Sequence, residues 1–197
     1  MKTQKIPEAT ISRLSVYSRF LSQGSEKGII TISSGDIAEG VGVSPAQVRK
    51  DLAYFGEFGT RGVGYNVKDL HYHILKILGL NKRWKAMIIG AGNLGSALSM
   101  YGGFRERGFD IEGMFDNDPK KIGQYLNGLE VRHIKDLPVV AKDKQVKIGI
   151  ITVPEEFAQE AADLLVDGGV VCLLNFAPRV LLVPDNVIVR NVDLSVN

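Results

Sequence analysis

Residues 84–95 read WKAMIIGAGNLG, and this stretch decides the architecture of the second half of the chain. An apolar run ends in Gly90, Gly92 and Gly95, which have the spacing G-x-G-x-x-G, and a helical pattern follows them. In a strand–turn–helix unit the first glycine turns the chain, the second lets a pyrophosphate approach the backbone, and the third allows close helix–strand packing. Amides at the helix N-terminus attract phosphate. The stretch predicts a dinucleotide site in a Rossmann-type domain; the alternative is a glycine-rich turn with a purely structural role.

Asp116 supports the dinucleotide interpretation, because it ends the next apolar run, DIEGMFD, about 20 residues beyond the glycines. A carboxylate at this point accepts hydrogen bonds from the adenosine ribose and repels a 2′-phosphate, which favours NAD(H) over NADP(H). Lys121 follows closely and weakens that exclusion.

Apolar runs alternate with helical stretches through this half, which predicts an α/β fold with a parallel sheet covered on both faces. The expected strands are Lys85–Ile89, Ile111–Phe115, Lys147–Val153 and Val170–Asn175, and the expected helices are Leu94–Arg107 and Glu155–Val166. Ligands bind beyond the carboxyl ends of such strands, and the apolar ends here disfavour the cationic oxidised nicotinamide, so we expect NADH to bind better than NAD⁺. The residues assigned to cofactor binding are Gly90, Ala91, Gly92, Asn93, Leu94, Gly95, Asp116, Lys121, Thr152, Val153, Pro154, Asn175 and Phe176.

The composition is that of a folded protein with room for two small domains: 197 residues, of which 45% are hydrophobic and 23% charged, with a net charge of +2. The single cysteine, Cys172, excludes an internal disulfide framework and a Cys-based zinc site. The sequence has no apolar stretch long enough for a membrane helix and no signal-peptide core at its N-terminus. We therefore expect a cytoplasmic protein without a metal site or a membrane partner.

A polar stretch at 79–83, GLNKR, precedes the Rossmann-type half, so we expect domains at 1–79 and 80–197. Residues 1–80 carry ten Lys and Arg against seven Asp and Glu, a balance that favours a polyanionic partner. In this first half, the spacing of apolar residues predicts a helix that begins after Pro7 and ends at Gly24. A short strand is expected at Ile29–Ser33.

Residues 34–55, SGDIAEGVGVSPAQVRKDLAYF, have the pattern of a helix-turn-helix. Ala38 is small where the two helices approach, Gly42 allows the sharp turn, and Val48 is the apolar residue that faces back to the first helix. Ser44 is the expected N-cap of the second helix. The exposed face of this helix carries small side chains together with Gln, Arg and Lys, which suits a helix that binds in the major groove of DNA. The alternative interpretation is an ordinary capped helix whose charged face is solvated. The residues assigned to DNA on this helix are Ser44, Ala46, Gln47, Arg49 and Lys50.

Residues 56–65, GEFGTRGVGY, predict a hairpin with Arg61 near its tip. Together with the helix-turn-helix this hairpin makes a winged helix, and an arginine at a wing tip is placed to enter the narrow minor groove of DNA. The alternative is a phosphate cradle, but the Gly-Lys-Ser/Thr that a nucleotide P-loop needs does not follow. The wing therefore favours DNA binding.

The residue pattern does not support catalysis, because a hydride-transfer enzyme needs a proton-handling residue and room for a second substrate. His71, His73 and His133 fit surface or packing positions, and few residues follow the core strands. We assign no catalytic residue. Two alternatives stay open: a small NAD-dependent oxidoreductase whose first half only dimerises it, and a nucleoid-type DNA-binding protein that is indifferent to the cofactor.

A winged helix joined to a short NAD-type Rossmann domain resembles the bacterial redox-sensing transcriptional repressor family Rex, over nearly the whole chain. The matching motifs are Ile6–Thr10, Arg13–Leu14, Val48–Leu52, Tyr54–Gly56, Gly62–Val67, Gly90–Gly95, Thr152–Pro154, Leu174–Pro178 and Asn191–Leu194. The resemblance implies a homodimer that places one winged helix on each half of an inverted-repeat operator. It also implies that NADH closes the dimer and releases the DNA, and that NAD⁺ competes without closing it.

The resemblance also implies roles for single residues. Arg49 and Lys50 are placed on the recognition helix and Arg61 on the wing. Arg13, Tyr101 and Asp193 resemble the polar set that exchanges partners between the DNA-bound and NADH-bound forms. Arg13 is also assigned to DNA binding. The sequence departs from the family at its end. Members continue into a C-terminal helix that swaps onto the partner subunit, whereas this chain stops at Asn197. We therefore expect either a shortened chain or a dimer held by Rossmann-domain contacts alone.

Overall fold

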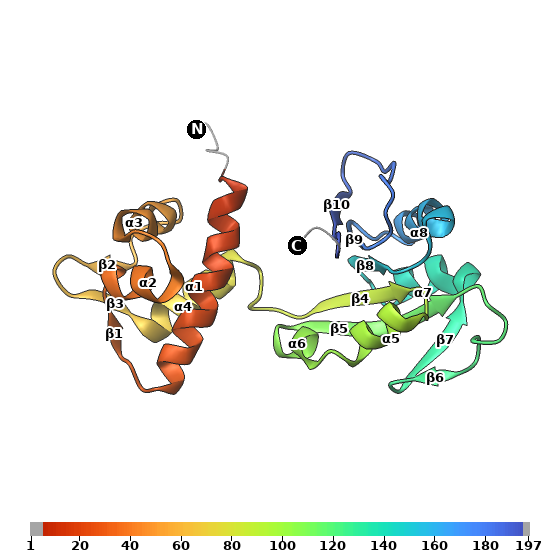
Figure 1. Ribbon diagram of the computed structural model, residues 1–197, viewed down its shortest axis with the longest axis horizontal. Coiled ribbons are helices and arrows are strands. Elements are labelled where there is room, and N and C mark those ends of the chain that lie inside the picture. Colours follow the sequence, from red (N-terminus) through yellow and green to blue (C-terminus); the bar gives the residue numbers. More distant parts are fainter. Residues whose placement is uncertain (1–5, 195–197) are drawn as a thin grey trace. The chain divides into compact units, whose positions relative to one another are not determined.

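The computed structural model describes residues 6–194 of the chain. The chain end at Val196 and Asn197, where the family pattern would continue, lies outside these residues. The chain divides into two compact units, one ending at Lys82 and the other starting at Arg83 (Figure 1). Within the described residues, no helix has both the length and the apolar character needed to cross a membrane.

The first unit is helical with a small antiparallel sheet. Its helices are α1 (Glu8–Glu26), α2 (Ser34–Val41), α3 (Pro45–Ala53) and α4 (Val67–Ile77), and its strands are β1 (Thr31–Ile32), β2 (Gly59–Thr60) and β3 (Gly64–Asn66), in the order β1-β3-β2. Side chains from all four of these helices form one core, because each helix has an apolar stripe at helical spacing. The core includes Leu14, Tyr17, Leu21, Ile37, Val48, Leu52, Leu70 and Ile74.

The prediction that Gly24 ends the first helix is wrong, because α1 continues to Glu26. Gly24 is buried inside the last turn, and a Cβ there would make only ordinary contacts, 3.8 Å from Ile29 and 4.0 Å from Val67. The left-handed residue after the helix is Gly28, with φ of 76°. The residue whose backbone conformation requires glycine at this helix end is therefore Gly28 and not Gly24.

The second unit is a Rossmann-type sheet with the strand order β10-β9-β8-β4-β5-β7-β6, in which β6 alone of the described strands pairs antiparallel. This confirms the predicted α/β fold. The strands are β4 (Trp84–Ile89), β5 (Phe109–Asp116), β6 (Tyr125–Leu126), β7 (Leu129–His133), β8 (Ile148–Ile151), β9 (Cys172–Asn175) and β10 (Ile188–Asn191). The helices are α5 (Asn93–Met100), α6 (Gly102–Glu106), α7 (Leu137–Asp143) and α8 (Glu155–Asp167), with a 3-10 turn, η1, at Ile134–Asp136.

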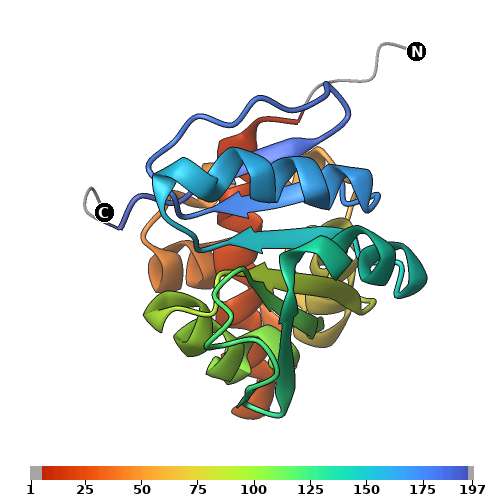
Figure 2. The ribbon, with the colours of Figure 1, turned by 90° about the vertical axis from the view of Figure 1, so that its right-hand side faces the viewer.

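Both faces of this sheet are covered, as the continuous apolar strands predict. Alternate residues of β4 point to opposite sides: Met87 and Ile89 pack with α7 and α8, whereas Ala86 and Ile88 pack with α5 and α6. Figures 1 and 2 show these helices beside the strands of the sheet. The crossover helices bring the carboxyl ends of β4, β5, β8 and β9 to one edge. That edge is where a ligand is expected.

The single helix predicted for Leu94–Arg107 is wrong, because the structure has two. Tyr101, with extended backbone angles of −71° and 102°, separates α5 from α6. Gly102 and Gly103 follow it, and a Cβ on Gly103 would lie 2.5 Å from the Tyr101 ring. The glycine therefore leaves room for the Tyr101 ring to lie against the start of α6.

Candidate nucleic-acid interface and dinucleotide pocket

The turn between α2 and α3 has the geometry that its sequence predicts. Gly42 caps α2 in the left-handed conformation, with φ of 74°, and its N–H donates to the Ala38 carbonyl. The Ser44 hydroxyl accepts from the Gln47 N–H at 3.1 Å and so starts α3, with Pro45 at the first helical position. Val48 and Ala38 are buried where the helices meet. These contacts fix the angle between α2 and α3.

The outer face of α3 carries most of the side chains assigned to DNA. Ala46, Arg49 and Lys50 are exposed, and the Arg49 guanidinium donates to the Ser34 hydroxyl at 2.9 Å. Gln47 is different. Its side chain is half-buried and its amide nitrogen donates to Asp51 Oδ1 at 2.9 Å, so it does not extend freely into solvent as we expected.

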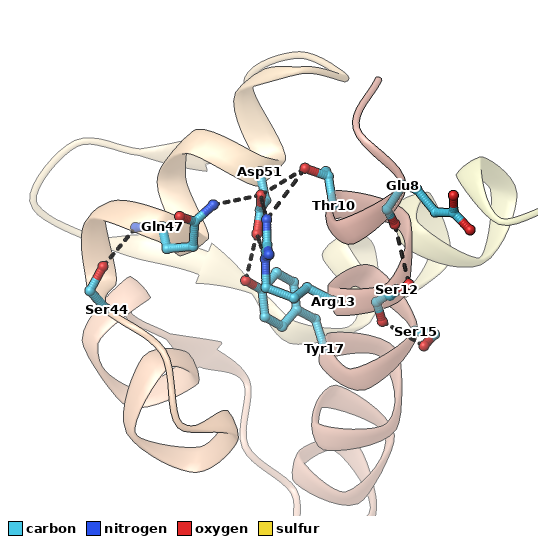
Figure 3. A network of polar contacts seen from close by, with 9 residues as sticks. All are labelled: Glu8, Thr10, Ser12, Arg13, Ser15, Tyr17, Ser44, Gln47 and Asp51. Carbon is cyan, nitrogen blue, oxygen red and sulfur yellow. Dashed lines mark hydrogen bonds and ion pairs between the residues drawn. The ribbon is translucent and has the colours of Figure 1, made fainter. Parts of the chain in front are cut away.

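Asp51 lies on the inner side of α3 with no exposed surface, and it joins α3 to α1 (Figure 3). The Arg13 guanidinium donates to both carboxylate oxygens, through Nε at 2.6 Å and Nη2 at 2.7 Å. The Tyr17 hydroxyl donates at 2.8 Å and the Thr10 hydroxyl at 3.1 Å. With Gln47, these donors satisfy a carboxylate that would otherwise be very costly to bury. Residue-by-residue sequence analysis gave Asp51 no role.

The network shifts the ionisation of its members. Burial raises the pKa of Asp51, but hydrogen bonds from Arg13, Tyr17, Gln47 and Thr10 lower it by more, so that it lies at about 2. The hydrogen bond to Asp51 raises the pKa of Arg13. Burial and the bond to Asp51 raise the pKa of Tyr17. Asp51 is therefore an anion, and Arg13 a cation, at any physiological pH.

We expect the depressed pKa of Asp51 to make the wild-type protein lose stability in acid. The stabilisation is fully present above the unfolded-state pKa near 4 and disappears as pH falls through the folded-state value of about 2. Between pH 5 and pH 2, wild type should lose about 2 kcal/mol more of its free energy of unfolding than Asp51→Asn does. Urea unfolding at each pH measures this difference, and parallel losses in the two proteins would contradict it.

The wing is a two-stranded hairpin. Gly59 pairs with Tyr65 and Thr60 with Gly64, and the Val63 N–H closes the turn on the Thr60 carbonyl at 3.0 Å. Arg61 lies exposed in this turn. A groove of about 710 Å³ runs between the wing and the α2–α3 pair, lined by Ser34, Arg49, Ala53, Thr60, Arg61 and Tyr65 among others. The structure thus brings Arg49 and Arg61 to one concave surface.

The second unit has a pocket of about 550 Å³ at the predicted edge of the sheet. Of the residues assigned to the cofactor, its lining includes Gly90, Gly92, Leu94, Asp116, Lys121, Thr152, Val153, Pro154 and Phe176. Sequence reasoning missed Phe157 and Glu160, which reach the lining from α8. Their signal is the spacing of three on a helix that begins just after Pro154.

The three glycines differ in what requires them, and this tests the fit of a dinucleotide. A Cβ on Gly95 would lie 1.9 Å from the Gly90 carbonyl oxygen, and one on Gly90 would lie 2.7 Å from the Thr152 carbonyl oxygen. A Cβ on Gly92 would meet no atom within 4 Å. Packing therefore demands the first and third glycines, while Gly92 keeps open the space before α5 into which a pyrophosphate would approach.

Asp116 ends β5 inside this pocket. Its carboxylate accepts from the Ala91 N–H at 2.8 Å and the Asp118 N–H at 2.9 Å, and it pairs with the Lys121 ammonium at 3.0 Å. Burial raises the pKa of Asp116, but these hydrogen bonds and Lys121 lower it by more. The pocket therefore offers an ionised carboxylate as acceptor, with a cation beside it.

The side chains of Thr152 and Asn175 both bond to backbone groups, and of the two only Thr152 also lines the pocket. The Thr152 hydroxyl lies 2.9 Å from the carbonyl oxygens of both Ile89 and Gly90. Asn175, assigned to the cofactor, has no exposed surface, and its amide group bonds Ala177, Arg179 and Asn191. Asn175 therefore cannot touch a ligand in this structure; it shapes the loop from which Phe176 reaches the pocket.

The three residues of the implied switch lie in different units. In the first unit, Arg13 is bonded to Asp51. In the second, Tyr101 is 55% exposed with its ring edge-on to Phe104 at 5.5 Å, and Asp193 lines a hollow of about 470 Å³ that Phe176 borders. Residues 6–194 contain no group of three or more His, Cys, Asp or Glu side chains that could hold a metal ion.

Known proteins share both halves of this chain. A family model described as "CoA binding domain" matches residues 81–179, and one described as "Putative DNA-binding protein N-terminus" matches residues 5–53. The chain is 68% identical over its full length to "Redox-sensing transcriptional repressor Rex" of Desulfitobacterium hafniense, of which it covers 94%. It is 66% identical over its full length to the protein of that name from Carboxydothermus hydrogenoformans, of which it covers 95%.

Solved structures agree. The structure of RSP, a Rex-family repressor, in complex with β-NAD⁺ and operator DNA has a TM-score of 0.94 and is 40% identical, covering 98% of this chain and 88% of that one. The structure of RSP with β-NADH has a TM-score of 0.88 and is 38% identical, covering 98% of this chain and 90% of that one. A winged helix and a dinucleotide pocket in one chain define a ligand-responsive DNA-binding protein. The chain belongs to the Rex family of redox-sensing transcriptional repressors, which are not enzymes.

Proposed function

We propose that this protein represses transcription by binding operator DNA as a homodimer and that NADH, bound in the second unit, releases it. The observation that carries the proposal is the relative RSP, a single protein of this fold whose structures contain either operator DNA with β-NAD⁺ or β-NADH. This chain has the two parts that such a sensor needs: a winged helix to bind DNA and a pocket to bind the dinucleotide. The protein acts in the bacterial cytoplasm, where DNA and the NAD(H) pool occur together.

The domain at 1–79 binds the DNA. Ala46, Gln47, Arg49 and Lys50 enter the major groove on α3, with Ser44 at the helix start, and Arg61 enters the minor groove from the wing. The groove between α3 and the wing supports this, because a ridge of DNA backbone fits between two elements that present arginines. Arg13 contributes a guanidinium at 29% side-chain exposure near the start of α1.

The domain at 80–197 binds NADH and NAD⁺. Residues 90–95 take the pyrophosphate at the start of α5, and Asp116 accepts from the adenosine ribose with Lys121 beside it. Val153, Pro154 and Phe176 supply the apolar wall for the nicotinamide, which favours the neutral reduced form. Thr152 and Asn175 hold the two strand ends.

Arg13, Tyr101 and Asp193 exchange partners between the two forms. The exposure of Arg13 supports this: 29% of its side chain is exposed, and its guanidinium has five N–H donors, of which the bonds to Asp51 and Thr10 use three, so a further acceptor can bind it. The exchange links the position of the recognition helices to the ligand in the pocket.

Reciprocal binding tests the function. If NADH weakens operator binding by some factor, operator DNA must weaken NADH binding by the same factor, and a typical coupling gives about 5- to 150-fold. Fluorescence anisotropy with labelled operator measures the first factor, and calorimetry with and without operator measures the second. Equal NADH affinity with and without DNA would contradict the proposal.

The wing arginine should be visible in the salt dependence of DNA binding. We expect Arg61→Ala to weaken binding and to reduce the slope of log K against log salt by about one for each Arg61 that neutralises phosphate. Arg105→Ala, an exposed arginine of α6, removes the same charge from the other unit and serves as the control. An unchanged slope in Arg61→Ala would remove Arg61 from the interface.

A further inference from the structure

Gln47 is held by the residue one turn further along α3. Its backbone N–H is bonded to Ser44 Oγ at 3.1 Å, and its side-chain Nε2 donates to Asp51 Oδ1 at 2.9 Å. Both ends of the residue are therefore fixed before any DNA arrives. An unrestrained glutamine side chain would lose much of its rotamer freedom on binding, so prior restraint strengthens recognition.

Asp51 also determines which way round the Gln47 amide lies. An ionised carboxylate only accepts hydrogen bonds, so the amide must turn its NH₂ group toward Asp51 (Figure 3). Asp51 stays ionised because the donors that face it from α1 include the Arg13 guanidinium, together with the Tyr17 and Thr10 hydroxyls. Consequently the Gln47 carbonyl oxygen and the second amide hydrogen are left for another partner.

We propose that Asp51 is a positioning residue that presents Gln47 as the reader of an adenine in the major groove. An amide edge with one acceptor and one donor matches the N6–H₂ donor and N7 acceptor of adenine. Gln47 lies in the first turn of α3, the part of a recognition helix that contacts base edges. The inference rests on the proposed function, because it presumes that α3 enters operator DNA.

Asp51 also stabilises the fold, so loss of binding alone would not separate the two roles. If Asp51 were purely structural, its substitution would weaken the protein's contacts at every base position of the DNA site together. If Asp51 positions Gln47, its substitution changes the base preference only at the position that Gln47 contacts. The readout must therefore be the base preference at each position of the site.

The experiment selects duplexes from a random-sequence DNA library with the full chain and sequences the bound fraction. We expect wild type to enrich an inverted repeat, and Gln47→Ala to lose an adenine preference at one position of each half. Asp51→Asn should lose the preference at that same position and keep the others. Replacing this adenine by 7-deazaadenine, which lacks N7, should weaken wild-type binding about tenfold and leave Gln47→Ala unaffected.

The possible outcomes separate the two proposals. If Asp51→Asn retains the adenine preference, or if Gln47→Ala changes no position, the inference is overturned while the proposed function stands. If wild type enriches no sequence, the proposed function is contradicted, and the inference with it.

A second measurement does not require a variant at Asp51 to fold. The NMR signal of the Gln47 side-chain amide can be identified because it is missing from the spectrum of Gln47→Ala. In the free wild-type protein, one proton of this amide should be protected from exchange with water. Gln23, an exposed residue of α1, is the reference. A Gln47 amide that exchanges as fast as that of Gln23 overturns the inference.

Discussion

Replacing Asp51 by alanine should lower the free energy of unfolding by about 3 kcal/mol. The carboxylate has no exposed surface, and its removal leaves the Tyr17 and Thr10 hydroxyls buried without their acceptor. Arg13 keeps partial access to water, with 29% of its side chain exposed, which holds the loss toward the lower end of the range for broken buried pairs. Urea unfolding followed by far-UV circular dichroism measures the change.

The matched control for Asp51→Ala is Asp110→Ala. Asp110 also pairs with an arginine, Arg83, but both side chains are substantially exposed. Water replaces the partner in such a pair, so the control should unfold close to the wild-type urea concentration. If the two alanine variants lost similar stability, burial would not be what makes the Asp51 network important.

Replacing Gly95 by alanine should destabilise the second unit by about 2 kcal/mol or more. The new Cβ would lie 1.9 Å from the Gly90 carbonyl oxygen and 2.9 Å from the Thr152 hydroxyl, and a backbone atom cannot move away as a side-chain end can. Helix α5 must therefore shift away from the turn that starts it. Fluorescence of Trp84, which begins β4, reports the unfolding of this unit.

Gly92→Ala is the companion variant, and its expected effect is the opposite. Its Cβ meets no atom within 4 Å and its φ of −86° suits alanine, so stability should stay within about 0.5 kcal/mol of wild type. The methyl group occupies space that the pyrophosphate needs, so NADH affinity should fall at least about tenfold. Undiminished NADH binding by calorimetry would show that the dinucleotide does not approach α5 through this gap.

Features encoded over a few residues could be predicted from the sequence. The turn between α2 and α3 depends on Gly42, Ser44 and Pro45, and each acts through its own backbone conformation or a partner within four residues. The glycines at 90–95 and Asp116 at the end of β5 are likewise local signals, since each strand end carries its own residue to the shared edge.

Features that depend on distant contacts could not. The donors to Asp51 on α1 lie 34 to 41 residues away in sequence, so an acidic residue on a charged helix has the pattern of a solvated one. Asn175 follows an apolar run and was assigned to the ligand, but its amide bonds to Asn191, 16 residues later. Gly24 and Gly28 are both glycines near the end of a helical pattern, and only the backbone of the folded chain shows that the left-handed one is Gly28.

The amide of Asn175 has a consequence for the energetics of coenzyme capture. It donates hydrogen bonds to the Ala177 and Arg179 carbonyls and to the Asn191 side chain. These bonds hold the segment that carries the Phe176 ring in place before a ligand binds. If Phe176 forms the wall for the nicotinamide as we propose, this segment is already ordered and loses little entropy when NADH binds. Binding free energy that would otherwise be consumed in ordering the segment remains for moving the rest of the protein, which is what a sensor must do.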